Sequence, residues 1–557
     1  MPEVANVATK FMKGAMTLSI SLFIVRLIGL LYLVPFQSLV GVGGFALYGY
    51  AYVPYSILVT LSGLGIPGGI SKFVAKYNAL GEYQTSRRVF RISMAFMLIF
   101  GMITFTVMYA SAPLFARMVI NSDDMYNSVA DVTTAIRMIS FAVIIVPPMS
   151  ILRGFFQGNQ DMKPTAISQL VEQLARISLI IGGSFVVIHL LEGSVQTAVN
   201  VSVFAAVIAA IGALLVLYRS WVKKKPDFDA LLATSVPTKR RRVDLLFKEL
   251  LSYALPFAVL SLIASLFQLI DLATFNSLMI SAGTDPRLTE AINGIYITGL
   301  FKIVMIPVSF AIAFGQPLMP AVTAKIQAND LKGARTTLAS AITLTSFITI
   351  PAVMGMWFLA NPIFIMLFNQ GSELNQIGGS IFATGSFIAI FMALNAILDA
   401  TMQGIAKHYT ALKILAGALV IKLVGNLVLI PRFGVNGAIL ATILAYAVCI
   451  VLKFLQVRKT TGIETRKIVR RHLAILVFTA LMLLVIWPAT LVLNRFIDYE
   501  ISRFYATLYV LAIGAIGVIV YGGLAIYFDL AKVLFGDKLS FNQISARFTK
   551  KTRRSQK

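Results

Sequence analysis

Apolar stretches of about twenty residues recur along the whole 557-residue chain, separated by short polar segments. A helix needs about 20 apolar residues to cross the roughly 30 Å hydrocarbon core of a bilayer. Windows of about 19 residues give about fourteen such stretches, from one near 14–38 to one near 504–528. Because backbone groups in lipid must be hydrogen-bonded within their own segment, these stretches predict helices. The sequence therefore predicts an all-α polytopic membrane protein with about 14 transmembrane helices.

The composition excludes several classes of protein. The chain is 58% hydrophobic and 13% charged, with a mean hydropathy of +0.84, which is more apolar surface than one soluble core buries. The net charge is +25, but no soluble domain is available to present it to a nucleic acid, so no nucleic-acid partner is expected. Cys449 is the only cysteine, and His189, His408 and His472 are far apart. We expect no disulfide, no metal site and no cofactor.

The basic residues predict the orientation, because cytoplasmic loops hold the excess of lysine and arginine. Of the 48 basic residues, 37 fall on the side of the N-terminus, the even-numbered loops and the C-terminus, five on the other side and six within spans. Both termini are therefore expected in the cytoplasm of a bacterium. The basic segments at 219–248 and after Asp529 are expected to contact anionic headgroups. The first apolar run, after Lys10 and Lys13, is expected to be an uncleaved span.

Two short echoes indicate an internal repeat. Residues 151–158 read ILRGFFQG and residues 397–404 read ILDATMQG, so four of eight positions match at an offset of 246. The same offset aligns Arg176 with Lys422. Residues 65–67 (GIP) and 315–317 (GQP) form the second echo. Both predict that spans 1–6 are repeated as spans 7–12 in the same orientation, as in transporters that work by alternating access.

The repeat defines the expected domains. They are an N-terminal six-helix lobe at 1–220, a basic cytoplasmic linker at 221–248, a C-terminal six-helix lobe at 249–460, two extra helices (13 and 14) at 461–530, and a basic cytoplasmic tail at 531–557.

Four basic side chains fall near the middle of predicted spans: Arg26, Arg176, Lys302 and Lys422. Each costs about 2.5–3.5 kcal/mol to insert at the centre of a bilayer, so each is expected to face water, a partner or a ligand. If they line one cavity, that cavity is cationic and suits an anion such as a pyrophosphate. The four residues are therefore the predicted substrate-binding residues.

Three acidic residues accompany them within the spans: Glu172, Asp271 and Asp399. Asp399 lies close enough to the cytoplasmic end of its span that we expect it to be solvated. Glu172 lies four residues before Arg176, so the two side chains can pair on one helix face. Asp271 lies in span 7, and its role is left open between an ion site and an ion pair with another helix.

The chain resembles the polysaccharide-biosynthesis flippases, and within them the MurJ and SpoVB-like lipid II flippases of the multidrug/oligosaccharidyl-lipid/polysaccharide (MOP) superfamily. The resemblance is carried by the fourteen spans, the repeat, the mid-membrane cations, and residues 63–72 (GLGIPGGISK) and 152–158 (LRGFFQG). It covers essentially the whole chain.

The resemblance implies a transporter rather than an enzyme. The expected substrate is lipid II, the undecaprenyl-pyrophosphate-linked peptidoglycan precursor, and the expected membrane contact for its tail is a groove at helices 13 and 14. Family cavities carry arginines on spans 1, 2 and 8. Arg26 fits the first position and Lys302 the third, whereas span 2 has no basic residue, so Arg176 and Lys422 are expected to supply that charge. A monomer is expected.

Three alternatives remain open from the sequence. The first is a flippase whose substrate is another lipid-linked polysaccharide unit. The second is a drug or cation antiporter of the same superfamily, for which Asp271 would supply a carboxylate. A lipid-linked-sugar transferase would instead need catalytic acids outside the membrane, and Asp123, Asp124 and Asp131 form the only such cluster.

Overall fold

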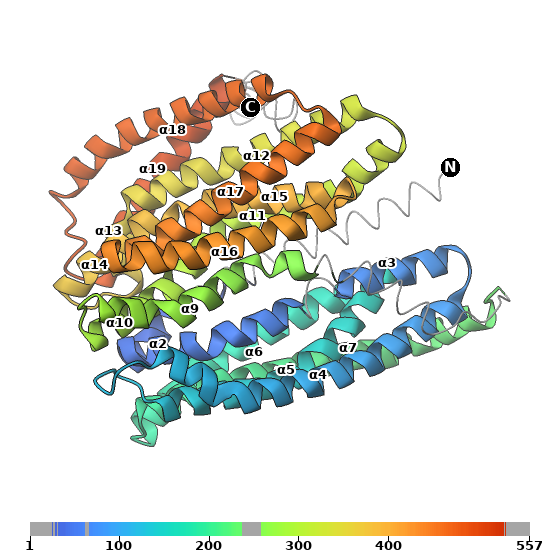
Figure 1. The fold of residues 1–557 in the computed structure, drawn as a ribbon, viewed down its shortest axis with the longest axis horizontal. Helices are drawn as coiled ribbons and strands as arrows, with labels where there is room; N and C mark the ends of the chain where they lie inside the picture. Colours follow the sequence, from blue (N-terminus) through green and yellow to red (C-terminus); the bar gives the residue numbers. More distant parts are fainter. Residues whose placement is uncertain are drawn as a thin grey trace, which may run out of the picture. The chain divides into compact units, whose positions relative to one another are not determined.

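The computed structural model describes residues 25, 28–29, 32–61, 66–236, 255, 258–528 and 530 (Figure 1). Thirteen helices in this part of the chain are long and apolar enough to cross a membrane. The predicted all-α polytopic class is thereby confirmed. Most of the first predicted span, and Arg26 within it, lie outside the described residues.

The helices follow one another along the chain in this order: α2 (Leu33–Thr60), α3 (Ile66–Ala79), α4 (Tyr83–Val119), α5 (Val129–Gly158), α6 (Lys163–Phe185), the π-helix η2 (Val186–Leu190), α7 (Val195–Ala233), α9 (Ile263–Ser281), α10 (Pro286–Asn293), the π-helix η3 (Gly294–Leu300), α11 (Phe301–Gln327), α12 (Leu331–Phe358), α13 (Ala360–Leu367), α14 (Ser372–Ser386), α15 (Ile388–Gly404), α16 (His408–Phe433), α17 (Val435–Thr461), α18 (Thr465–Leu493) and α19 (Arg503–Tyr527).

The chain divides by its contacts into two compact units. Unit 1 holds Met1–Lys302 and His408–Ala441, and unit 2 holds Ile303–Lys407 and Thr442–Lys557. In unit 1 the long helices α4, α5 and α7 run alongside one another, and α2 contacts α9, α10 and η3 (Figure 1). Segments of the predicted second lobe thus pack with helices of the first. The two units are defined by contacts and the two predicted lobes by the sequence repeat, so the division into two six-helix lobes stays a prediction.

Helix α2 consists of two helical segments joined at a kink. It begins at Leu33 and ends at Thr60, with a kink at Gly41, whose φ of 65° and ψ of −170° are not helical. A glycine adopts a positive φ at little cost because it has no Cβ. Two helical segments therefore meet at this glycine, on either side of the kink. The next helix, α3, begins at Ile66, within the GIP segment of the second echo.

Helix α7 continues into the segment predicted as a linker. It ends only at Ala233, and Trp221 stacks on Phe90 of α4 with ring centroids 4.9 Å apart. Phe228 packs edge-on against Phe155 of α5, with centroids 5.2 Å apart. Aromatic rings bury large apolar areas, so these contacts hold the end of α7 against the bundle. The rest of the predicted linker, including Lys239, lies outside the described residues.

Helix α10 is tied to the loop between α4 and α5 by one buried carboxylate. Glu290 is 0% exposed and accepts hydrogen bonds from the Tyr126 N–H and the Asn127 Nδ2, both at 2.6 Å. Asn127 Nδ2 also donates to the Gly43 carbonyl of α2 at 2.9 Å. A buried charge is tolerated when hydrogen bonds satisfy it, as they do here. The clamp fixes the start of the continuous element α10–η3–α11 that carries Lys302.

Small residues bring η3 and α2 into close contact just before Lys302. A Cβ added at Gly294 would lie 3.2 Å from the Ala46 Cβ, and one added at Gly49 would lie 3.7 Å from the Thr298 Cβ. A larger side chain at either glycine would force the two elements apart. This packing sets Lys302, two residues beyond the end of η3, against the face of α2.

Candidate functional site

Lys302 lies against a group of tyrosines from α2. Its Nζ donates a hydrogen bond to the Tyr32 hydroxyl and lies 4.2 Å from the centroid of that ring. The same Nζ lies 5.5 Å from the ring of Tyr48 and 5.9 Å from that of Tyr52. An ammonium group over aromatic faces is stabilised by the ring quadrupoles. No carboxylate of the described residues pairs with Lys302, so its positive charge is not neutralised within this part of the chain.

Tyr48, Tyr52 and Tyr55 form a row along one face of α2, because residues four and seven apart share a face of a helix. Tyr48 and Tyr52 are stacked with centroids 5.6 Å apart, and Tyr52 meets Tyr55 edge-on at the same separation. We call these three residues the tyrosine row. Tyr52 is half-buried, whereas Tyr55 is 1% exposed. The spacing was present in the sequence, but tyrosine in a membrane helix has many uses and the row was not predicted.

The second charged group, here named the Glu172 cluster, consists of Arg153, Glu172 and Arg176. Arg176 Nη2 lies 2.6 Å from Glu172 Oε1, which is the pair that the four-residue spacing predicts. Arg153 Nη2 lies 2.8 Å from Glu172 Oε2, and Arg153 Nε donates to the Ser168 hydroxyl at 3.0 Å. Two guanidinium groups therefore share one carboxylate. The sequence reasoning missed Arg153, because it stands near the end of its span and was counted with the loop charges.

The tyrosine row connects the two charged groups. Tyr48 and Tyr52 face Lys302, and Arg176 lies within electrostatic range of Tyr48, Tyr52 and Tyr55. The structure thus brings two of the four predicted cations, Lys302 and Arg176, near the tyrosine row of α2. Both belong to unit 1.

Lys422 pairs with an acidic residue of another helix. Its Nζ lies 2.5 Å from Asp271 Oδ1, and both side chains are 0% exposed. It also donates to Asn426 Oδ1 and to the Ala438 carbonyl, each at 3.0 Å. Lys422 was expected to face water, a partner or a ligand, and the structure gives it a partner. The acid comes from α9, and the ammonium is enclosed by protein oxygens.

Asp271 is equally well satisfied. Its Oδ2 accepts from the Tyr296 hydroxyl at 2.9 Å, and its Oδ1 accepts from Asn426 Nδ2 at 2.8 Å. Both oxygens of this carboxylate are therefore engaged by protein groups. Of the two roles left open by the sequence, the ion pair with another helix is the one observed.

Unit 2 contains a second pair that the sequence did not indicate. Lys453 Nζ lies 2.7 Å from Asp399 Oδ1, with the lysine side chain 0% and the aspartate 13% exposed. Asn395 contributes to both, since its Nδ2 donates to Asp399 and its Oδ1 accepts from Lys453, each at 2.7 Å. Asp399 was expected near solvent at the helix end, but the pair is mostly enclosed.

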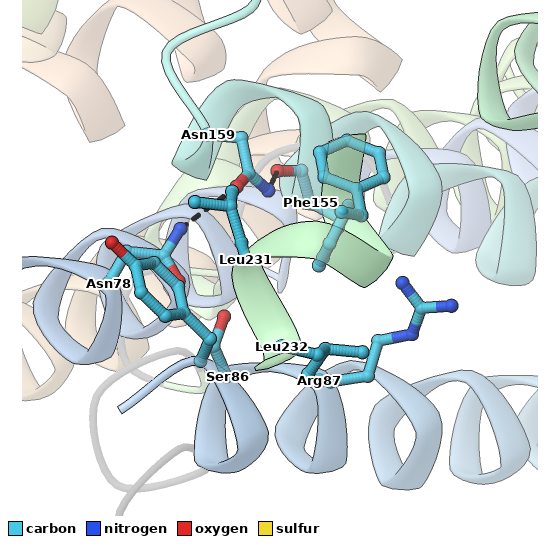
Figure 2. Close-up of a pocket in the computed structure, with 9 residues that line it drawn as sticks. Asn78, Ser86, Arg87, Phe155, Asn159, Leu231 and Leu232 are labelled. Atoms are coloured by element: carbon cyan, nitrogen blue, oxygen red, sulfur yellow. Dashed lines mark hydrogen bonds between the residues drawn. The ribbon is translucent and has the colours of Figure 1, made fainter. Parts of the chain in front are cut away.

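A small cavity lies between α3, α4, α5 and α7 (Figure 2). Its volume of about 20 Å³ is room for about one water molecule. Asn78 Nδ2 donates to Asn159 Oδ1 at 2.9 Å across it, while the guanidinium of Arg87 points away from this pair (Figure 2). Arg87 instead lies 4.4 Å from the ring of Trp221. The cavity is too small for a glycan or a lipid headgroup.

One member of the acidic cluster that a transferase would need, Asp131, has a local structural role. Asp131 caps helix α5, because its carboxylate accepts from the Ser128 N–H at 2.9 Å and the Ser128 hydroxyl accepts from the Asp131 N–H. This reciprocal arrangement is a capping box. The Asp124 carbonyl accepts from Arg287 Nε at 3.1 Å. The capping box explains Asp131 without catalysis, whereas the Asp124 contact is made by its backbone carbonyl.

Comparison with known proteins adds independent information. Residues 11–325 match the family described as "Polysaccharide biosynthesis protein", and residues 301–510 match "Lipid II flippase MurJ". The chain is 36% identical over 515 residues to the lipid II flippase MurJ of Bacillus subtilis (strain 168), covering 92% of this chain and 94% of that protein.

Solved structures show the same fold. A structure of "Lipid II flippase MurJ, inward closed conformation" aligns with a TM-score of 0.65 and 16% identity, covering 92% of this chain and 99% of that one. An inward-facing multidrug transporter of the MATE family and MOP superfamily aligns with a TM-score of 0.62 and 17% identity, covering 79% of this chain and 98% of that one. The fold and the identity over nearly the full length lead to one conclusion: the chain belongs to the MurJ family of multi-pass bacterial membrane proteins.

Proposed function

We propose that this protein exports lipid II across the bacterial cytoplasmic membrane by alternating access. The observation that carries the proposal is the 36% identity to a lipid II flippase over 92% of the chain. The un-neutralised ammonium of Lys302 gives that likeness a chemical basis, because the substrate carries a pyrophosphate. The protein acts as a transporter and not as an enzyme.

Lys302 is the proposed contact for the pyrophosphate. Its charge is held among aromatic rings, which keep an ammonium in place without cancelling its charge as a carboxylate would. Arg176, at the other end of the tyrosine row, is the second proposed contact. Arg26 remains a proposed third contact from the sequence, and it lies outside the described residues.

Lys422 and Asp271 are proposed to hold α16 to α9 rather than to bind substrate. Their charges cancel, and both are 0% exposed. The same contacts argue against a drug or cation antiporter that would use Asp271, because both of its oxygens already accept hydrogen bonds.

The direction of transport follows from the membrane potential. Moving one negative charge out of a cytoplasm that is negative inside is favoured by about 2.3 kcal/mol per 100 mV. A doubly charged pyrophosphate would gain about twice that. Export therefore needs no nucleotide under this proposal.

We further propose that the protein is a monomer with both termini in the cytoplasm and two six-helix lobes. Helices α18 and α19 provide the groove for the lipid tail under this proposal.

The test is transport in liposomes that contain only the purified protein. An impermeant quencher distinguishes fluorescent lipid II in the outer leaflet from that in the lumenal leaflet. The measurement is made with and without a potential imposed across the liposome membrane. We expect exchange of lipid II that the potential accelerates. Exchange of a different lipid-linked glycan, with none of lipid II, would replace the proposed substrate by that glycan.

Alternating access predicts that a covalent bond between α2 and η3 stops transport. The Cβ positions of Gly49 and Thr298 are 3.7 Å apart, within the 3.5–4.5 Å range of disulfides. Gly49→Cys with Thr298→Cys should therefore cross-link on oxidation, and lipid II exchange should fall to background and return on reduction. The controls are the reduced double variant and the Thr298→Cys single variant, because a Cβ at Gly49 would clash with the hydroxyl oxygen of an unchanged Thr298. Native Cys449 is buried. Undiminished exchange by the cross-linked protein would show that α2 and η3 do not separate during transport.

A further inference from the structure

Two polar groups beside the Glu172 cluster have no hydrogen-bond partner among the described residues. They are Arg176 Nε and the Tyr55 hydroxyl, and both atoms are buried. Leaving a buried donor unpaired is expensive, so such groups call for an explanation, commonly a ligand or an ordered water. Tyr55 is the last member of the tyrosine row, and Arg176 and Glu172 both act on it electrostatically. Helix α2, which carries Tyr55, packs against α6, which carries Arg176, so the two unpaired donors lie in one neighbourhood.

The charge of the cluster has the sign that an anion requires. Arg153 and Arg176 contribute two positive charges, and Glu172 contributes one negative charge. One positive charge is left over. The cluster is also held in place, because Glu172 bonds the Nη2 of both arginines and Ser168 fixes Arg153 through its Nε. Glu172 uses one Nη of Arg176 and leaves the Nε of that guanidinium available.

We propose that Arg176 Nε and the Tyr55 hydroxyl donate to one phosphate-type oxygen and form an anion subsite separate from Lys302. Arg153 and Glu172 are positioning residues, since they orient the Arg176 guanidinium without contacting the anion. A guanidinium suits this ligand because its fixed N–H groups match phosphate oxygens. Arg176 is also a contact in the proposed function. The roles of Tyr55 and Arg153, and the use of Arg176 Nε as the donor, go beyond it.

The position of the subsite suggests what it does. Tyr52, half-buried, lies between it and Lys302, in contact with the rings of Tyr48 and Tyr55. A pyrophosphate that leaves Arg176 would meet Lys302 at the other end of the row. The phosphate belongs either to the lipid-linked substrate, in which case the inference rests on the proposed function, or to an anionic phospholipid headgroup.

The test uses the full-length protein in nanodiscs of phosphatidylcholine, with inorganic pyrophosphate as the probe. Lys302→Gln is made first, so that the subsite is measured without the other cation. In this background Tyr55→Phe, which removes only the hydroxyl, should weaken pyrophosphate binding about tenfold. Arg176→Lys, which keeps the charge but loses the Nε–H, should weaken it by at least as much. Tyr521→Phe, a buried tyrosine of unit 2, is the matched control and should bind as its parent.

Two further arms identify the source of the phosphate. Lipid II is added to one set of nanodiscs and phosphatidylglycerol to another, and each is tested as a competitor of pyrophosphate. Competition by lipid II that Tyr55→Phe abolishes assigns the subsite to the substrate. Competition by phosphatidylglycerol alone assigns it to a phospholipid, and that result stands even if the protein does not transport lipid II.

Tyr55→Phe also distinguishes a ligand-binding role of the Tyr55 hydroxyl from a structural one. Because the hydroxyl has no partner among the described residues, its removal should leave the melting temperature in detergent unchanged or slightly higher. Unchanged pyrophosphate binding in both Tyr55→Phe and Arg176→Lys would overturn the proposal, and would leave these donors to an ordered water.

Discussion

Lys302→Gln is expected to abolish lipid II transport while leaving the protein folded and in the membrane. The substitution removes the positive charge that we assign to the pyrophosphate, and a hydrogen bond to a charged group contributes about 1.5–3 kcal/mol. That is roughly a 10- to 150-fold loss for one contact. Lys302→Arg should retain part of the activity, since an arginine keeps the charge against Tyr32 and its neighbours.

Complementation of a strain depleted of its own flippase measures this, with the amount of membrane-inserted protein measured in parallel. Lys332→Gln is the matched control, because Lys332 is exposed at the start of α12. The fold should survive in the Lys302 variant since no described carboxylate loses a partner. Arg26→Ala is expected to fail in the same assay. Normal growth with Lys302→Gln would remove Lys302 from the transport mechanism.

Breaking the Lys422–Asp271 pair should produce the largest loss of stability. Asp271→Asn or Lys422→Met alone leaves one buried charge without its partner, which typically costs about 3–5 kcal/mol. The double variant removes both charges, so most of that loss should be recovered. Asn426 and Tyr296, which bond Asp271 in the parent, limit the recovery because they lose a charged acceptor.

The melting temperature of the purified protein in detergent measures the effect. Lys467→Met is the control, because it breaks an exposed pair with Glu464 in which the side chains are 75% and 62% exposed. Exposed pairs contribute little, so its melting temperature should not change detectably. If Asp271→Asn and Lys422→Met melted like the parent and yet failed to transport, the pair would have a functional role and our structural assignment would be wrong.

The helices were predictable because lipid imposes one rule on every span. A backbone in hydrocarbon must satisfy its own hydrogen bonds, and a stretch of about 20 apolar residues is enough to identify a helix. The ends were less predictable. Helix α7 runs on to Ala233 because Trp221 and Phe228 find aromatic partners on other helices, and no local pattern records those partners.

The candidate site was predictable only in part. Mid-membrane charges are costly enough to be noticed in a sequence, which is why Lys302 and Arg176 were found. Glu172 was found as a partner because it stands four residues from Arg176 on the same helix. Arg153 and the tyrosine row were missed, since their importance comes from what surrounds them.

The amino-acid sequence by itself determined that this chain spans a bilayer and that it is helical. It also identified the basic side chains whose position within the membrane needs an explanation. Only the tertiary structure decided which of those charges is cancelled. Lys422 and Asp271 are 151 residues apart, and their ion pair exists because α16 packs against α9. Lys302 has no carboxylate partner among the described residues, and lies instead against aromatic rings of the α2 segment. The physical reason is that charges interact through space, whereas spacing along one helix reports only the neighbours within a turn or two.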